Sequence, residues 1–305
     1  MSGVRFKQHE SSLGADALGV DLSQPLSESD AALILGALSA FGVLRFPGQN
    51  LQPDLIKAFA SRFGTLEVNV AGAFQEPGMP EVMTLSNMIV DGNPIGLSDA
   101  GQDWHTDMSY SAEVAFANVL YGMVIPRRDG IPLGNTEFAD MYAAYDDLPD
   151  EVKDRLAGVT ATHDFNKFWE AMRTRPGSTR QKLTEEQRRK KPPVSHPVVL
   201  RHPVTGRKIL YANPGYTMWI DGWDRAESDA MLDYLFAHQL QAEYRYTHSW
   251  TENDLLIWDD LCTLHNAIPD YRADEPRLIK RCQVMADRVF DPAFAQKARF
   301  DFTFV

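Results

Sequence analysis

The stretch Trp104-His105-Thr106-Asp107-Met108 places a histidine and an aspartate two positions apart. On an extended chain, side chains two positions apart lie on the same face, so His105 and Asp107 could bind one metal ion. Two ligands do not close a metal site, and a plausible third, His265, ends the distant stretch that begins at Trp258. Two histidines and one carboxylate are typical of Fe(II) sites with open coordination positions. The pattern predicts an iron centre formed by His105, Asp107 and His265.

Short apolar stretches on both sides of these residues indicate a β-rich fold. Apolar or alternating runs predict strands, and apolar residues at helical spacing predict helices. The expected strands cover 43–46, 114–123, 196–200, 208–211, 244–246 and 254–258, and the expected helices lie within 27–42, 53–64, 146–156 and 226–237. A double-stranded β-helix, or jelly roll, pairs strands across long connections and would bring His105 and His265 together. We therefore predict an α+β fold with a mainly β core of this kind and flanking helices, in a single domain spanning residues 1–305.

Two segments are predicted to form lid-like loops. Residues 91–103 are polar and glycine-rich and lead directly into Trp104. Residues 165–195 hold the one basic island of the chain, which consists of Arg173, Arg175, Arg180, Lys182, Arg188, Arg189, Lys190 and Lys191. Charge runs usually face water, which favours a solvated helix or a disordered insertion. The alternative is a lid that attracts anions.

The composition limits the classes of partner. The chain has 305 residues, of which 44% are hydrophobic and 24% charged, and it contains no long uncharged apolar run, so we expect no membrane insertion. A net charge of −12 disfavours binding to nucleic acid. Residues 1–7 lack the pattern of a secretory signal, and Cys262 and Cys282 form no Cys-x-x-Cys motif, so we expect a cytoplasmic protein with reduced thiols. A homo-oligomer, either a dimer or a tetramer, is the usual expectation.

Two arginines follow His265 and supply candidate anion sites. Arg277 and Arg281 lie four positions apart, so on a strand both guanidinium groups would point to the same face, where each can hold an anion with two hydrogen bonds. An open-sited iron centre leaves room for an acidic co-substrate and dioxygen. The pair therefore predicts two acidic ligands; the alternative is a surface strand with exposed charges.

Five motifs follow one another along the chain: Trp104-His105-Thr106-Asp107, Gly134-Asn135-Thr136-Glu137-Phe138, the run from His202 to Asn213, the run from Trp258 to His265, and Arg277-x-x-x-Arg281. Together they resemble the taurine dioxygenase-like family of Fe(II)- and 2-oxoglutarate-dependent oxygenases. The resemblance extends to Gly14–Leu22 and Phe41–Leu44, so it covers residues 13 to 290.

The resemblance implies a role for each motif residue. His105, Asp107 and His265 would bind the iron, Arg277 would hold the distal carboxylate of 2-oxoglutarate, and Thr136 would add a hydroxyl hydrogen bond, although by residue type alone Thr136 is a turn residue. Arg281 would act in catalysis by facing the prime substrate. The implied reaction consumes dioxygen, decarboxylates 2-oxoglutarate to succinate and carbon dioxide, and hydroxylates a substrate carbon.

The substrate expected from Arg281 is a small organic anion with a carboxylate, sulfonate, sulfate or phosphonate group. Asn69 and Gly72 occupy the stretch where taurine dioxygenases have a histidine and a tyrosine, and Gly101 replaces an asparagine of the family, which argues against taurine. Phe165 and Tyr216 match aromatic pocket positions, although buried aromatic residues are also common in cores. The stretch from Asp260 to Tyr271 is more similar to the aryloxyalkanoate branch, in which hydroxylation releases the heteroatom.

Two other classes of function remain open at this point. A zinc or nickel hydrolase or isomerase with a jelly-roll fold could use the same three ligands with a metal-bound water. A ligand-binding protein without activity could retain the scaffold. An isolated histidine is also more often a hydrogen-bonded structural residue than a ligand.

Overall fold

The computed structural model describes residues 3–68, 74–175 and 180–305, and its largest element is a sheet of eight strands in the order β1-β2-β3-β18-β8-β20-β5-β4. Neighbouring strands are antiparallel except β2 and β3, which are parallel. The strands are β1 (Arg5–Gln8), β2 (Ala15–Leu18), β3 (Val43–Phe46), β4 (Gln75–Glu76), β5 (Met79–Ser86), β8 (Ala115–Val124), β18 (Leu255–Asp259) and β20 (Leu278–Met285). Strands from both ends of the chain thus meet in one sheet.

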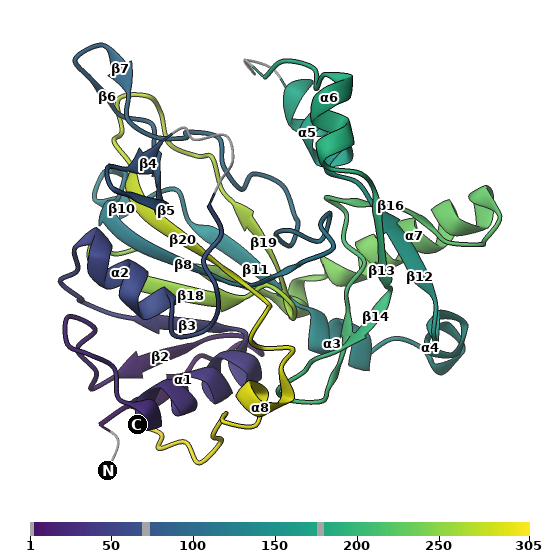
Figure 1. The fold of residues 1–305 in the computed structure, drawn as a ribbon, viewed down its shortest axis with the longest axis horizontal. Helices are drawn as coiled ribbons and strands as arrows, with labels where there is room; N and C mark the ends of the chain where they lie inside the picture. Colours follow the sequence, from purple (N-terminus) through teal and green to yellow (C-terminus); the bar gives the residue numbers. More distant parts are fainter. Residues whose placement is uncertain (1–2, 69–73, 176–179) are drawn as a thin grey trace.

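Helices cover one face of this sheet, as Figure 1 shows for α1 (Glu28–Phe41), α2 (Pro53–Ala60) and the short α8 (Pro292–Ala295). Ser27 begins α1 by accepting a hydrogen bond from the backbone N–H of Asp30, and Gly42 ends it with a φ of 70°, as the sequence predicts. The predicted helix after Pro53 is also present, but it ends at Ala60, before Gly64.

A second, smaller sheet faces the first. It has the order β17-β11-β19 and consists of β17 (Arg245–His248), β11 (Thr136–Asp140) and β19 (Thr263–Ala267). Buried side chains from both sheets meet between them, and the ring of Phe138 on β11 lies 5.3 Å from the ring of Trp258 on β18. Because an apolar core fills the space between the two sheets, His265 on β19 is held against the large sheet.

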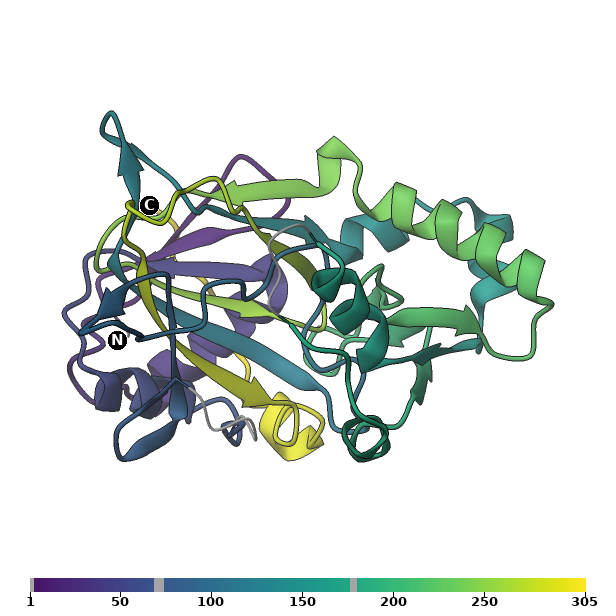
Figure 2. The same ribbon diagram turned by 90° about the horizontal axis from the view of Figure 1, so that it is seen from above.

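The middle of the chain forms a lobe beside the two sheets, and Figure 2 shows its long helix α7 extending away from them. The lobe contains β12 (Thr160–His163), β13 (Val194–Pro197), β14 (Val199–Arg201), β15 (Lys208–Leu210), β16 (Thr217–Ile220), α3 (Met141–Asp146), α4 (Asp150–Leu156), α5 (Phe165–Arg173), α6 (Glu185–Lys190), α7 (Arg225–Gln239) and the 3₁₀ turn η1 (Ala242–Tyr244). The predicted hairpin is the antiparallel pair β14-β15. Two small hairpins project elsewhere: β6 (Ile89–Val90) with β7 (Asn93–Pro94), and β9 (Arg127–Arg128) with β10 (Ile131–Pro132).

The stretch around His105 differs from the extended strand that the spacing argument assumes. Within residues 104–108, only His105 makes a β-bridge. The chain then turns from Asp107 to Tyr110, with Met108 at a φ of 59°. The prediction of a strand over 104–108 is therefore wrong, because His105 pairs with β19 while Asp107 already belongs to a turn.

The two lid-like segments have different characters. The described part of 165–195 contains the helices α5 and α6 and the strand β13, and every residue of α6 is exposed, as a solvated helix requires. The segment 91–103 contains the two-residue strand β7 and no other helix or strand. Asn69 and Gly72 lie outside the described residues. None of the described helices has the length and apolar character needed to cross a membrane.

Candidate active site

A backbone bridge brings His105 and His265 together. The backbone N–H of His105 donates to the carbonyl of His265 at 3.1 Å, and the N–H of His265 donates to the carbonyl of His105 at 2.8 Å. Residues that exchange both hydrogen bonds in an antiparallel pair present their side chains on the same side. The imidazole ring centroids accordingly lie 4.2 Å apart. The two distant sequence motifs thus meet through their backbones.

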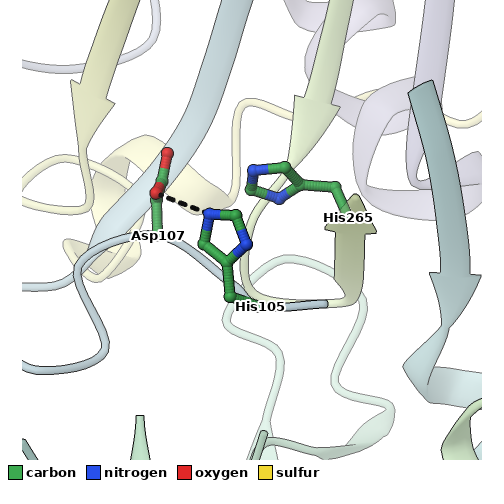
Figure 3. A group of neighbouring side chains, drawn as sticks. All are labelled: His105, Asp107 and His265. Carbon is green, nitrogen blue, oxygen red and sulfur yellow. Dashed lines mark ion pairs between the residues drawn. The ribbon is translucent and has the colours of Figure 1, made fainter. Parts of the chain in front are cut away.

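The turn after His105 adds the carboxylate of Asp107 to this pair. Its Oδ1 lies 3.4 Å from Nε2 of His105, and Figure 3 shows the aspartate and the two histidines side by side. One potential ligand atom from each of the three residues lies within 4.8 Å of the others. The hydroxyl of Thr106 donates to the carbonyl of Asp260, which fixes the start of the turn. The structure therefore groups the three residues that the sequence predicts, although not on a strand.

The histidine nitrogens have the environment that a metal ligand needs. Nδ1 of His105 lies 2.7 Å from the carbonyl of Asp103, so it carries the proton and leaves the lone pair on Nε2, which faces Asp107. Nδ1 of His265 is buried without a hydrogen-bond partner in the described chain. Burial and the neighbouring His105 hold the pKa of His265 well below its usual range. Neutral imidazoles and one carboxylate fit Fe(II) bound by a facial triad.

A polar network below Asp107 holds its carboxylate ionised. Nη2 of Arg281 donates to Oδ2 of Asp107 at 2.6 Å, and Asn118 donates to the same oxygen at 2.9 Å. Burial alone would raise the pKa of Asp107, but Arg281 and then His105 keep it well below its usual range. Burial and the charge of Asp107 raise the pKa of Asp260, which accepts hydrogen bonds from Asn118 and Trp258. Of the two carboxyl groups, that of Asp107 is thus ionised, and the pKa of Asp260 is raised.

Arg277 forms a second, separate cation. Its side chain is buried, its Nε has no hydrogen-bond partner in the described chain, and no described carboxylate makes an ion pair with it. Its backbone is fixed by a hydrogen bond from its N–H to Asn87, and Gly134 packs against its guanidinium. The guanidinium lies 5.7 Å from the ring centroid of Tyr271. Burying a guanidinium without a carboxylate partner is costly, so such a group is typical of a site that receives an anion.

Thr136 lies in the sheet that carries His265. It pairs with Ala267 on β19, and its buried hydroxyl accepts a hydrogen bond from the indole N–H of Trp250 at 3.1 Å. By residue type Thr136 was expected in a turn, which is wrong: the chain bends at Gly134, and Thr136 begins strand β11. The hydroxyl hydrogen remains available for a second partner.

Aromatic rings form a wall beside the metal ligands, which we call the aromatic wall: Phe168, Tyr216, Tyr110 and Phe165. The ring of Phe168 lies 4.8 Å from that of His105, and the ring of Tyr216 lies 6.0 Å from it. The ring of Tyr110 lies 4.7 Å from that of Tyr216, and the ring of Phe165 lies 4.9 Å from that of Tyr110. Of the two predicted pocket residues, Tyr216 therefore adjoins the metal ligands, whereas Phe165 lies at the far end of the wall.

Several residues of the site were not predicted. Asn118 is the one polar side chain in the apolar stretch 115–120, and this isolation was a usable signal. Phe168 and Tyr110 could not be identified from the sequence, because an aromatic residue by itself does not indicate a position in a site. Gly215 packs so closely on His105 that a Cβ there would lie 2.6 Å from the Cβ of His105. The predicted Gly101 has a φ of 74° and accepts a hydrogen bond from the N–H of Ala267.

Comparisons with known proteins agree with this geometry. The family model described as "Taurine catabolism dioxygenase TauD, TfdA family" matches residues 5–283. An alpha-ketoglutarate-dependent 2,4-dichlorophenoxyacetate dioxygenase from Burkholderia sp. (strain RASC) is 34% identical over 80% of this chain and 82% of its own. Pentalenolactone F synthase from Streptomyces avermitilis is 32% identical over 93% of each chain.

A solved structure shows the same similarity in three dimensions. The crystal structure of AAD-2 in complex with Mn(II) and N-oxalylglycine has a TM-score of 0.76 and 28% identity, covering 93% of this chain and 98% of that one. Together with the grouped ligands, these matches exclude a hydrolase or isomerase as the preferred class. The chain belongs to the TauD, TfdA family and is an oxidoreductase that uses Fe(II), 2-oxoglutarate and dioxygen.

Proposed function

We propose that this dioxygenase hydroxylates a small organic anion with an apolar body, and that Arg277 and Thr136 hold the distal carboxylate of 2-oxoglutarate while it is decarboxylated to succinate and carbon dioxide. The buried guanidinium of Arg277 carries this proposal. It has no acidic partner among the described residues, and 2-oxoglutarate would supply one. The free hydroxyl hydrogen of Thr136 would be a second donor to the same carboxylate.

The protein's part in the reaction is to position and to exclude water. When bound, Fe(II) and 2-oxoglutarate supply the oxidising chemistry. His105 and His265 would hold the metal as neutral donors, and Asp107 would add the one negative charge, oriented by Arg281 and Asn118. The aromatic wall would shield the reacting carbon from water.

The substrate side of the proposal involves Arg281, Phe165, Tyr216 and Asn69. Arg281 already pairs with Asp107, so a substrate anion would bind at the remaining N–H groups of its guanidinium. A relative is named for its action on 2,4-dichlorophenoxyacetate, a carboxylate with an aromatic ring. The aromatic wall suits a substrate of that type. If the hydroxylated carbon carries oxygen, nitrogen or sulfur, the product would break down and release that heteroatom.

Ligand binding and product formation test this function separately. Anaerobic addition of Fe(II) and 2-oxoglutarate should give a weak visible charge-transfer band in the wild type and none in His105→Ala. His9→Ala, a histidine that pairs with Asp16 on the strand pair β1-β2, is the matched control and should keep the band. Aryloxyalkanoates, sulfonates, sulfate esters and phosphonates would then be screened for succinate release. Absence of the band in the wild type would overturn the proposal.

Features of the fold and the setting are part of the same proposal. We propose that the two facing sheets form a jelly roll in one domain over residues 1–305, and that segments 91–103 and 165–195 act as lids. Ion pairs between Arg180 and Asp99 and between Arg175 and Asp103 support contact between these segments. The free, buried cysteines suit a cytoplasmic setting. We also predict a dimer or tetramer, to be checked by light scattering, and no binding to nucleic acid.

A further inference from the structure

Lys191 lies at the far end of the aromatic wall. Its ammonium nitrogen is 4.3 Å from the ring centroid of Phe165 and 4.9 Å from that of Tyr110. These two rings are 4.9 Å apart with an interplanar angle of 59°, so the ammonium lies in the angle between them. Cation–π contacts of this kind hold a positive charge but leave its N–H donors free.

Lys191 differs from its neighbour Lys190 in the partners of its ammonium group. Among the described residues, none forms an ion pair with its ammonium group, and the side chain is only partly exposed. Its neighbour Lys190 is different, since it is 72% exposed and pairs with Glu186 at 2.9 Å. Burial lowers the pKa of Lys191, and the negative charge of Glu67 acts in the opposite direction. A solvated helix would not place a cation against two rings, so Lys191 differs from the exposed cations of α6 that precede it.

A continuous set of contacts links Lys191 to the metal ligands. Tyr110 touches Tyr216, and Tyr216 adjoins the ring of His105. The rings of Tyr110 and Phe165 are both half-buried. Beside Phe165 and Lys191 lies a cavity of about 210 Å³. Its lining residues are Asp164, Phe165, Asn166, Leu183, Arg188, Lys191 and Pro193.

Two cations therefore lie along the aromatic wall, and the negative charge of Glu67 acts on both of them. Arg281 is next to Asp107 at the metal end, and Lys191 closes the other end. A substrate with one acidic group would use only one of them. A substrate with an acidic group at each end and an aromatic or apolar body between would use both cations and the rings.

Resting on the proposed function, we infer that Lys191 determines specificity by binding a second acidic group of the prime substrate, so that the preferred substrate class is an elongated dianion. One acidic group would lie near Arg281, and the body of the molecule would extend along Tyr216 and Tyr110. The second acidic group would accept hydrogen bonds from the Lys191 ammonium.

A matched pair of substrates tests this assignment. Phenoxyacetate and 4-carboxyphenoxyacetate differ only in the distal carboxylate, and both would be assayed by succinate release and by direct binding to the Fe(II)–2-oxoglutarate enzyme. The wild type should prefer the dianion. Lys191→Met keeps the apolar stem and removes the charge, and it should lower kcat/KM for the dianion by about 10- to 100-fold, with a change of less than about threefold for the monoanion.

Three further variants separate charge from packing. Lys191→Arg should retain the preference for the dianion, and Lys190→Met, the exposed neighbour, should leave both substrates unaffected. Lys191→Glu should favour 4-(aminomethyl)phenoxyacetate, whose distal group is a cation. A variant that has merely lost packing would lose all three substrates together.

The outcomes distinguish this inference from the proposed function. An unchanged charge-transfer band with Fe(II) and 2-oxoglutarate in Lys191→Met would show that the centre is intact. If that band is present and the wild type binds neither compound, or if the ratio of kcat/KM for the two substrates is the same in wild type and Lys191→Met, the inference is wrong while the proposed function stands. If the wild type gives no band, the proposed function fails first.

Discussion

Arg281 donates a 2.6 Å hydrogen bond to Asp107, so the cation predicted to meet the substrate is also the partner of a metal ligand. Its Nε donates to Asn118, which in turn donates to the same carboxylate oxygen. Arg281 therefore belongs to the metal centre as well as to the proposed substrate site. The two roles can be separated by measuring metal affinity and substrate affinity on the same variant.

Arg281→Ala should weaken metal binding as well as substrate binding. Loss of a hydrogen-bond partner of a metal ligand typically costs about 10- to 100-fold in affinity, and the KM for the prime substrate should rise far more than the KM for the co-substrate. Titration of the protein with Mn(II), followed by calorimetry, measures the first effect. Arg127→Ala removes an exposed arginine paired with Glu252 and is the control. Unchanged Mn(II) affinity in Arg281→Ala would contradict a role in orienting Asp107.

Arg277→Met should show the reverse pattern. Its buried guanidinium forms no ion pair with Asp107, and its Nε has no hydrogen-bond partner in the part of the chain that the structure describes. Mn(II) affinity should therefore stay within about threefold of the wild type, because that affinity depends on the orientation of the metal ligands. The KM for the co-substrate should rise by about 100-fold, as expected for a lost charge-assisted pair in a buried site. Steady-state kinetics with varied 2-oxoglutarate checks this. Equal effects of the two arginine variants on both KM values would contradict separate roles.

The ligand residues could be predicted from the sequence because their chemistry is rare and their motifs are local. His105, Asp107 and His265 were identified by residue type, and the structure groups them. The reason given for Asp107 was wrong, since a turn and not strand alternation brings it to His105. A turn of this kind depends on Thr106 and Asp260, whose contact cannot be read from either motif alone.

The pocket could not be predicted to the same extent. The aromatic wall joins Tyr110, the last residue of the turn that contains Asp107, to Phe165 on α5 and Tyr216 next to β16. Its formation depends on how the lobe packs beside the sheets, which is a long-range property without a local pattern. Lys191 was included in a basic island that was expected to face water, and its contacts with Phe165 and Tyr110 are visible only in the folded chain.

Gly215→Ala should damage the metal site without unfolding the protein. A Cβ at this position would lie 2.6 Å from the Cβ of His105 and 3.2 Å from the carbonyl of Trp104, so the turn or the ligand must move. We expect Mn(II) affinity to fall by about tenfold or more, because metal ligands must be held closely in place. Circular dichroism and the melting temperature should change little. If Gly215→Ala binds Mn(II) as tightly as the wild type does, the turn can move without displacing His105.

The buried His248 should make the protein less stable as the pH falls below 6.5. Burial, with Arg45 adding to the effect, lowers the pKa of this histidine to about 3, from an ordinary value of 6.5. Between these two values the unfolded chain binds a proton that the folded chain does not, so the free energy of unfolding decreases with falling pH, by at most about 1.4 kcal/mol per pH unit for this group. Above pH 6.5 the contribution is constant.

His248→Gln removes the titrating group. Its free energy of unfolding, measured with urea between pH 7 and pH 4.5, should therefore depend less on pH than that of the wild type, whatever the variant's absolute stability. Burial also lowers the pKa of His163 to about 3, so His163→Gln should likewise make the pH dependence of the free energy of unfolding shallower. If the wild type and His248→Gln show parallel pH curves, His248 takes up its proton in the folded state. Its buried ring must then become accessible to water.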